Sequence, residues 1–274
     1  MLHFYDKAWF AVALAFAAPV NIADALMKPE TACEMENGLP QDTQGFMAEA
    51  DACLAADKTD SDFETAFAVR SAKYRAQTDE TALALRDGLS AAAQLHAQNM
   101  AARGFVDHAS PEGRDHIDRV RLLDRPLIFG AFGAHVAAVD TRNVDEAFAV
   151  LIDHDSYRDN LGRGLFNSHG IGVASKNGMT YIVHVFAQTD GELDHALPTE
   201  LSGQWEIAPE LFDSSLQMTG WRLVSPSGDV VSQGRGSHIA AENTPTSLSL
   251  EIVAQHSGTK AEHVLKGPSI ASGS

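Results

Sequence analysis

The sequence predicts an α+β protein: an α-β-α sandwich with a small β-rich C-terminal extension. Apolar residues recur at helical spacing over residues 83–103. Two β-rich runs, 169–175 and 179–188, are joined through Asn177-Gly178, a pair that favours a tight hairpin turn. The second run is apolar on both faces except for His184, so helices should cover both sides of the sheet.

The composition is that of a folded, acidic protein. The 274 residues are 45% apolar and 21% charged, which is enough for one large or two modest domains. There are 37 acidic and 20 basic residues, and the formal net charge is −17. Such a surface repels phosphate backbones and anionic lipids, so we expect neither nucleic-acid binding nor electrostatic docking on a membrane.

Residues 1–25 have the features of a secretory signal peptide. Lys7 gives a weakly basic front, residues 8–20 are apolar apart from Pro19, and Ala23-Asp24-Ala25 offers small residues for cleavage. The apolar run is too short for a membrane-spanning helix, which needs about 20 residues. The sequence therefore predicts an exported protein, periplasmic or extracellular, with no integral membrane segment after leader removal. A buried core helix is the alternative interpretation.

Cys33 and Cys53 are the only two cysteines. Both follow the predicted leader, and an even count in an exported chain suggests one disulfide, which would stabilise the fold by about 3 kcal/mol. It would staple an N-terminal extension over residues 26–61, where no long periodic run is visible. Two buried free thiols are the alternative, and two lone sulfurs do not make a zinc site.

Regular structure is predicted from residue 62 onward. A short amphipathic helix begins near Phe63, and Gly88 interrupts the longer helix over 83–103. His96 lies on the apolar face of that helix, where a hydrogen-bonded core histidine is more common than a ligand. Gly104 is placed to end the helix in the left-handed conformation.

A further helix and a cluster of arginines follow. Asn143 and Glu146 form a capping pattern that predicts a helix running to about Asp155. Four arginines precede it, and aspartates are interleaved with them, so we expect a solvated face of paired charges rather than an anion site. These arginines are Arg114, Arg119, Arg121 and Arg125.

Two groups of motifs carry a family resemblance. The first lies around His108, in the loop after the long helix, and the second ends in the strands of the predicted hairpin. The matching positions are Ala93 to Ala97, Met100, Phe105, His108, Ser110-Pro111, Gly113, Arg119, Asn160-Leu161, Phe166, Gly170 to Val173 and Tyr181 to Phe186. In order and spacing they resemble the CAP superfamily (cysteine-rich secretory, antigen 5 and pathogenesis-related proteins) in its bacterial exported branch. The resemblance implies a CAP-type α-β-α sandwich over residues 62–190.

The resemblance also implies a cleft with two histidines and one or two glutamates around a cation or water. His108 matches the first histidine. Ala134 stands where a glutamate is expected, and Tyr157 stands where the second histidine is expected. Because two of the expected polar ligands are missing, a tight divalent site at these positions is not expected.

A relocated metal site is the alternative. His135 and His154 each lie within three positions of a lost ligand, and with His108 they would offer three imidazoles, for which zinc is the natural metal. His169 or His184 would be a further member. Scattered histidines are the simpler interpretation, because three ligands must converge within about 2.1 Å of one point.

The resemblance ends at Gln188. A hairpin turn at 225–228 and a strand near 247–254 predict a small β-rich subdomain over residues 199–256. We expect Trp205 and Trp221 in its core, with a sugar platform as the functional alternative. Residues 257–274 are polar and contain Gly and Ser, so we expect a flexible tail.

These features favour an exported binding or scaffold module over an enzyme. Its partner would be a small apolar ligand, a peptide, or an envelope or extracellular protein; lipid or sterol binding is what some members of the family imply. Ala134 supplies no carboxylate for general base catalysis. The alternative is a metal-assisted hydrolase that uses His108 and the relocated histidines with zinc.

Overall fold

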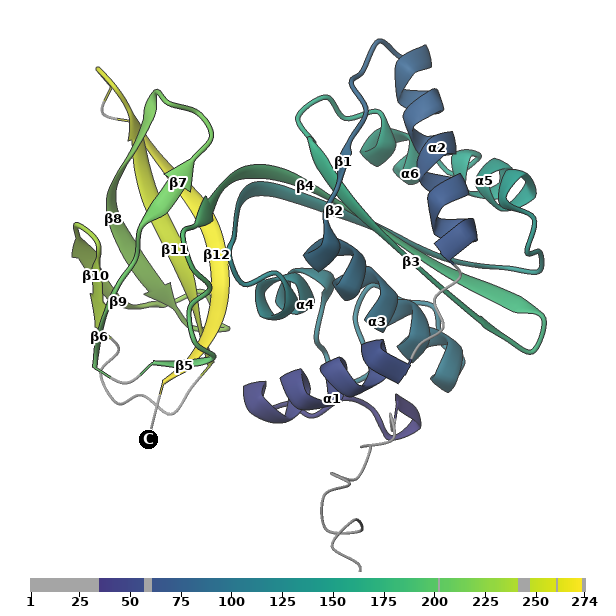
Figure 1. Cartoon of the computed structure of the whole chain (residues 1–274), viewed down its shortest axis with the longest axis horizontal. Helices are drawn as coiled ribbons and strands as arrows, with labels where there is room; N and C mark the ends of the chain where they lie inside the picture. The colour runs from purple at the N-terminus through teal and green to yellow at the C-terminus, as the bar shows by residue number, and fades with distance from the viewer. Residues whose placement is uncertain (1–34, 57–60, 202, 241–246, 260, 273–274) are drawn as a thin grey trace, which may run out of the picture. The chain divides into compact units, whose positions relative to one another are not determined.

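A computed structural model describes residues 35–56, 61–201, 203–240, 247–259 and 261–272 (Figure 1). The predicted leader and Cys33 lie outside these residues, so the leader and the disulfide remain predictions. Cys53 is buried. In the part of the chain that is described, no helix is long and apolar enough to cross a membrane.

A helix precedes the sandwich, where the sequence indicated only an irregular extension. A 3-10 turn at Met35–Asn37 is followed by α1, Thr43–Ala56. Phe46, Ala50 and Cys53 are buried and belong to the same cluster as Leu95. This single apolar stripe is short and interrupted by polar residues, so α1 depends on packing against the rest of the protein rather than on its own pattern.

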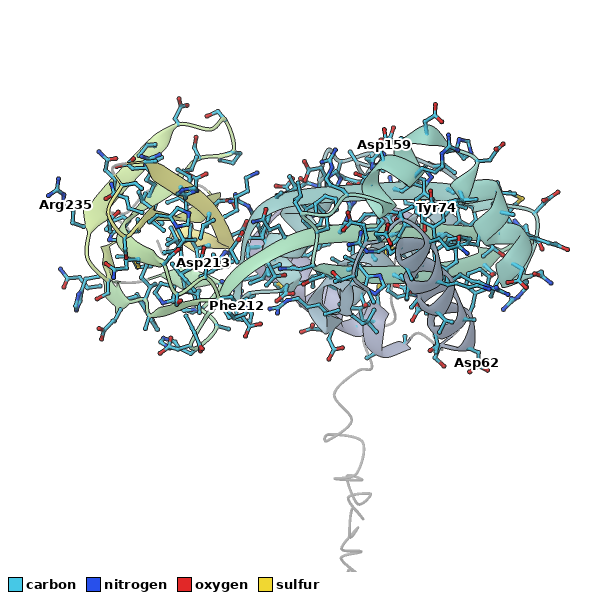
Figure 2. The ribbon with its side chains drawn as sticks, turned by 90° about the horizontal axis from the view of Figure 1, so that it is seen from above. Asp62, Tyr74, Asp159, Phe212, Asp213 and Arg235 are labelled. Atoms are coloured by element: carbon cyan, nitrogen blue, oxygen red, sulfur yellow. The ribbon has the colours of Figure 1, made fainter. Side chains whose placement is uncertain are left out.

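Two layers of helices enclose the sheet, which confirms the predicted sandwich. The helices are α2 Ser61–Gln77, α3 Asp87–Arg103, α4 His116–Leu123, α5 Val144–Ile152 and α6 Asp155–Leu161. Residues of α3 and α4 pack on one face, together with Val183 and Val185. Residues of α2, α5 and α6 pack on the other face, together with Ile182 and Phe186. Figure 2 labels Tyr74 of α2 and Asp159 of α6.

The sheet of the sandwich has the order β1-β3-β4-β2. Its strands are β1 Ala84–Leu85, β2 Leu127–Val139, β3 Ser168–Lys176 and β4 Met179–Leu193. The hairpin of β3 and β4 forms as predicted, with positive φ at Asn177 (54°) and Gly178 (83°). Helix α3 begins at Asp87 rather than residue 83, because Ala84 and Leu85 pair with β3. Gly88 lies in its first turn and does not divide it, and Gly104 ends it at φ 71°.

Helix α3 and strand β3 touch through their backbones. Gly170 and Gly172 face the helix, and a Cβ at Gly172 would lie 2.2 Å from Gln94 N. The Gln94 side chain lies against the strand: Nε2 donates to Val173 O (2.9 Å) and Oε1 accepts from Val173 N (2.7 Å). The amide side chain thus takes the place of a neighbouring strand at Val173.

The C-terminal extension continues the same sheet. Its strands are β5 Glu200–Leu201, β6 Gln204–Glu206, β7 Pro209–Leu211, β8 Leu216–Val224, β9 Val230–Arg235, β10 His238–Ala240, β11 Ser247–His256 and β12 Glu262–Ser272. Strands β8 and β9 form the predicted hairpin, and Trp221 lies in the core that the extension builds. Trp205 packs against that core.

The prediction of a flexible tail from residue 257 is wrong for β12. This strand pairs with β11 along most of its length and with β2 at Lys266 and Phe129. Leu265 and Ile270 are buried. Its sequence is polar and contains Gly and Pro, so it shows no clear strand pattern. Pairing with the two neighbouring strands stabilises β12 despite its low β-propensity.

The arginines of residues 114–125 are structural, and the expectation of a solvated face is wrong. Arg119, 3% exposed, donates to Arg114 O and His108 O. Arg125 donates to the carbonyls of Leu197, Pro198 and Ser269, and so ties the sandwich to the extension. A guanidinium has five N–H donors, and here they bond to backbone carbonyls, four of them in loops and one, that of Ser269, in strand β12.

We predict that Gly172→Ala destabilises the fold by about 2 kcal/mol or more, because the new Cβ would collide with helix backbone that cannot rotate away. Ser175→Ala, at an exposed position of the same strand, is the control. Urea unfolding of both variants measures the difference. Equal stability of the two variants would show that α3 and β3 are not in tight contact.

Candidate functional site

Three histidines form a row across neighbouring strands. His135 of β2 lies directly opposite His184 of β4, and His169 of β3 lies diagonally beyond it, opposite Phe186. Residues two apart on a strand share a face, so all three rings face the layer of α2, α5 and α6. His184 Nε2 and His169 Nδ1 are hydrogen-bonded at 2.9 Å.

Tyr157 of α6 contacts this row from the helix layer that covers it. Its hydroxyl is 3.0 Å from His184 Nδ1, and both residues are 0% exposed. If the phenol donates, His184 Nε2 carries the proton and donates to His169, so one directional chain uses both ring nitrogens of His184. Burial raises the pKa of Tyr157, and a hydrogen bond with Ser71 opposes the rise, so the phenol stays neutral.

The other predicted site residues lie around the row without joining it. His154 is exposed at the start of α6, with its ring centroid 6.0 Å from that of His135. His108 is exposed in the loop after α3, and its ring centroid is 5.6 Å from that of His116. His116 in turn stacks on Phe132 with ring centroids 5.3 Å apart.

His116 is a member of the site that sequence reasoning missed. It is the first residue of α4, whose N-terminus is closed by a reciprocal capping box between Asp115 and Asp118. The sequence Asp-x-x-Asp after a Pro/Gly turn could have identified His116, because this pattern fixes the first residue of the helix and therefore the position of the His116 ring.

Five histidines of the domain have pKa values lowered mainly by burial. The pKa falls to about 3 for His96 and to about 4 for His116, His135 and His169, and lies well below its ordinary range for His184. Neighbouring positive charge adds to the effect: Arg119 at His96, and Arg75 at His169. These imidazoles are therefore neutral near pH 7. His96 is buried as predicted, with Nε2 2.7 Å from Asp107 O.

The predicted zinc site of His108, His135 and His154 is not assembled. Within the described ranges, no group of three or more His, Cys, Asp or Glu side chains is arranged to hold a metal. Alternation along β2 is the reason. His135 faces α6, whereas Phe132, the ring on which His116 stacks, packs with the cluster of α3 and α4. His108 lies beside His116 of that second group, and it is also near enough to His135 to contribute to the lowered pKa of that ring.

Ala134 occupies the expected glutamate position and makes a different contact. Its side chain is half-buried against the cluster of α3 and α4. Its carbonyl oxygen accepts a hydrogen bond from Asn160 Nδ2 at 3.2 Å. That carbonyl therefore points away from β4, toward the outer side of β2.

Strand β2 has a long unpaired edge beside these residues. It pairs with β4 over its whole length, but with β12 only at Phe129. Among the described strands, none pairs with the outer side of residues 131–139. Residues 130–138 are all of intermediate exposure. We refer to residues 131–139 as the β2 edge.

Comparison with known proteins gives one family match. Residues 71–188 match the family model described as CAP, the cysteine-rich secretory protein family. No curated protein matches the chain.

Two solved structures illustrate the structural likeness. An extracellular protein containing an SCP domain from Bacillus anthracis str. Ames is 19% identical, with a TM-score of 0.43, over 47% of this chain and 41% of that chain. An outer surface protein from Borrelia burgdorferi is 14% identical, with a TM-score of 0.42, over 47% of this chain and 93% of that one. The match therefore spans less than half of the Bacillus protein.

We predict that Tyr157→Phe lowers the free energy of unfolding by about 1 to 3 kcal/mol, because it leaves buried His184 Nδ1 without its partner. Tyr74→Phe on α2, whose ring packs against Phe148, is the matched control. Urea unfolding compares the two. A loss no larger than that of Tyr74→Phe would mean that the hydroxyl contributes nothing to the row.

We also predict that the protein loses stability in acid between about pH 6.5 and pH 4. The folded pKa values of the five histidines lie below the ordinary value of about 6.5, so stability is full above pH 6.5 and falls as the unfolded chain takes up protons. Each such histidine contributes about 1.4 kcal/mol per pH unit in this window.

Urea unfolding at pH 7.5, 6 and 5 measures the slope. His169→Gln removes one titrating group, so we expect a slope smaller by about 1.4 kcal/mol per pH unit, whatever the variant's absolute stability. A slope unchanged by the substitution would contradict the assignment of His169 as neutral in the folded state.

Proposed function

Because residues 71–188 of this chain form a CAP domain, we propose that the protein is an exported, non-catalytic binding module that takes an extended peptide segment of an envelope or extracellular partner at the β2 edge. The observation that carries the proposal is the unpaired outer side of residues 131–139. Export rests on the predicted leader at residues 1–25.

The β2 edge lacks the features that usually keep sheet edges from pairing. Its sequence, Ala131-Phe-Gly-Ala-His-Val-Ala-Ala-Val139, contains no Lys, Arg, Asp, Glu or Pro. Protein edges are commonly blunted by charges, prolines or bulges. An uncharged edge offers its backbone groups to an incoming strand, which is how many domains bind peptides.

The direction of the backbone groups can be assigned along this edge. The amide and carbonyl of one strand residue point to the same side, and the Ala134 carbonyl points outward to Asn160. The amides of Ala134, Val136 and Ala138 then face outward, while His135 and Ala137 bond to β4. An incoming strand would meet these outward groups and displace Asn160.

The side chains around the edge differ between its two faces, which gives a peptide two kinds of surroundings. Phe132, Ala134 and Val136 form an apolar row with the cluster of α3 and α4. On the opposite face, His135 lies beside His154 and Tyr157. Alternate side chains of a bound strand would therefore meet apolar contacts on one side and neutral imidazoles on the other.

The chemistry of the site favours binding over catalysis. The Tyr157 hydroxyl and both nitrogens of His184 are used within the protein. His116 and His135, with pKa values of about 4, are weak bases at neutral pH, and a general base works best when its pKa is near the working pH. Ala134 provides no carboxylate that could raise the pKa values of these histidines.

A proline at an outward amide tests peptide binding. Peptides selected from a displayed library on the wild-type protein should bind Ala138→Pro at least about tenfold more weakly, because one backbone donor is lost while β4 pairing is kept. Ala138→Ser retains the amide and should bind as wild type does. Amide chemical shifts should change along residues 131–139. Peptides that bind Ala138→Pro normally would exclude the edge as their site.

Metal analysis tests the hydrolase alternative. After purification in zinc-supplemented buffer, we expect well below one zinc per chain, because His108, His135 and His154 do not converge. Stoichiometric zinc in the wild type that disappears in His108→Ala, but persists in His195→Ala, would favour the metal-assisted hydrolase. His195 is exposed in the segment after β4 and serves as a matched control.

A further inference from the structure

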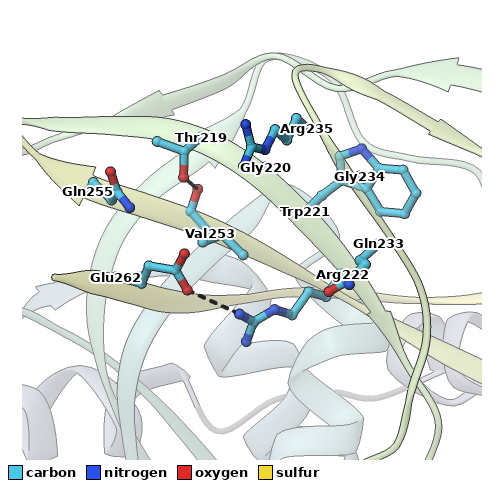
Figure 3. A pocket seen from close by; sticks show the side chains of 10 residues that line it. All are labelled: Thr219, Gly220, Trp221, Arg222, Gln233, Gly234, Arg235, Val253, Gln255 and Glu262. Carbon is cyan, nitrogen blue, oxygen red and sulfur yellow. Dashed lines mark hydrogen bonds and ion pairs between the residues drawn. The ribbon is translucent and has the colours of Figure 1, made fainter. Parts of the chain in front are cut away.

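The outer face of strands β8, β9, β11 and β12 carries a polar cavity that the proposed peptide site does not use. Its volume is about 560 Å³, and it is shown in close-up in Figure 3. Six polar side chains from these four strands line it: Thr219, Arg222, Gln233, Arg235, Gln255 and Glu262. Trp221 and Leu223 belong to the core on the other face, so their neighbours Gly220 and Arg222 face outward.

A bulge and a glycine produce the hollow. Val253 of β11 pairs with Gly220, but the next residue, Ala254, pairs with Met218, which leaves Thr219 as the extra residue of β8. Bulges bend a strand and redirect its side chains. Gly220 has no side chain in the outward row, and the β9 backbone comes close to it: a Cβ there would lie 2.5 Å from Gly234 O. Val253 forms an apolar floor between the polar groups.

The charges of the cavity are nearly balanced. Arg222 Nη2 lies 3.2 Å from Glu262 Oε2, an ion pair that reaches across the sheet. Arg235 is the remaining cationic side chain, so the lining carries one net positive charge in a chain of net charge −17. One spare charge is too few for a polyphosphate or a nucleic acid. A polar lining also disfavours a lipid, which needs mostly apolar walls.

We propose that this cavity binds a saccharide carrying at most one acidic group per bound unit. Sugar hydroxyls both donate and accept hydrogen bonds, and the lining offers both functions. These donors and acceptors come from all four strands: they are the amides of Gln233 and Gln255, the Arg222–Glu262 pair and the Thr219 hydroxyl. Planar amide, guanidinium and carboxylate groups can each bond two neighbouring hydroxyls. Trp221 also borders the cavity, but it is only 5% exposed, so its ring offers little surface for stacking and recognition is by hydrogen bonding.

Calorimetric titration of the full chain with two probes tests the proposal. The probes are the tetramer of N-acetylglucosamine, which is neutral, and tetragalacturonate, which is acidic. We expect saturable binding of at least one, with amide shifts at Gln233 and Gln255. Gln255→Ala and Gln233→Ala should each weaken binding about tenfold, and Gln204→Ala, an exposed amide on β6, should leave it unchanged.

Absence of binding by both saccharides would overturn the proposal, and so would equal affinity of Gln255→Ala and Gln204→Ala. A peptide that competes with the probes and shifts the same residues would show that the cavity is a second peptide site instead. Because Ala138→Pro lies on β2, it should leave saccharide binding intact. A negative result for the saccharide proposal can therefore be distinguished from a negative result for the peptide proposal.

Discussion

The close contact between α3 and β3 is the constraint on which the rest of the domain depends. Gly170 and Gly172 let the helix backbone approach the strand backbone, and the Gln94 side chain pairs with Val173 as a strand would. This contact fixes which face of β3 turns toward α3, so His169 must point the other way. The antiparallel register of β3 with β4, and of β4 with β2, then places the side chains of His184 and His135 on the same face as His169. A chain of local pairings, each set by the one before it, thus decides which imidazoles meet.

Sequence reasoning succeeded where local chemistry settles the conformation. Asn177-Gly178 takes the positive φ angles of a tight turn, Gly104 ends α3, and Asn143 caps α5 through the amides of Asp145 and Glu146. It failed where distant contacts decide. Helix α1 and strand β12 have weak patterns of their own, and each is stabilised by neighbours far away in the sequence. The sequence around residues 114–125 predicts solvated charges because it shows the nearby aspartates, but not the distant backbone carbonyls to which these guanidinium groups donate.

The candidate site was predictable as a set of residues but not as an arrangement. The histidine positions could be read from the sequence, and the replacements Ala134 and Tyr157 indicated that the polar chemistry had changed. Which strand histidines share a face depends on strand parity and register, and these place His135, His184 and His169 together. The bond between Tyr157 and His184 joins residues 27 apart, on a helix and a strand that only the folded chain brings together.

Strand β12 has a consequence for how the protein is made. It comprises residues 262–272 and lies between β11 and β2 in the sheet, although β2 comes much earlier in the sequence. Arg125 donates a hydrogen bond to the carbonyl of Ser269 in this strand. While a ribosome is still adding these residues, β11 has an open edge and Arg125 lacks one of its three carbonyl partners. This segment adds the pairing of β12 with β2 and the bond from Arg125 to Ser269 to contacts that already join the sandwich and the extension, such as the pairing of β4 with β7. Until this segment has emerged, β11 and the start of β2 each have one unpaired edge, and a holding chaperone would be of most use at this stage.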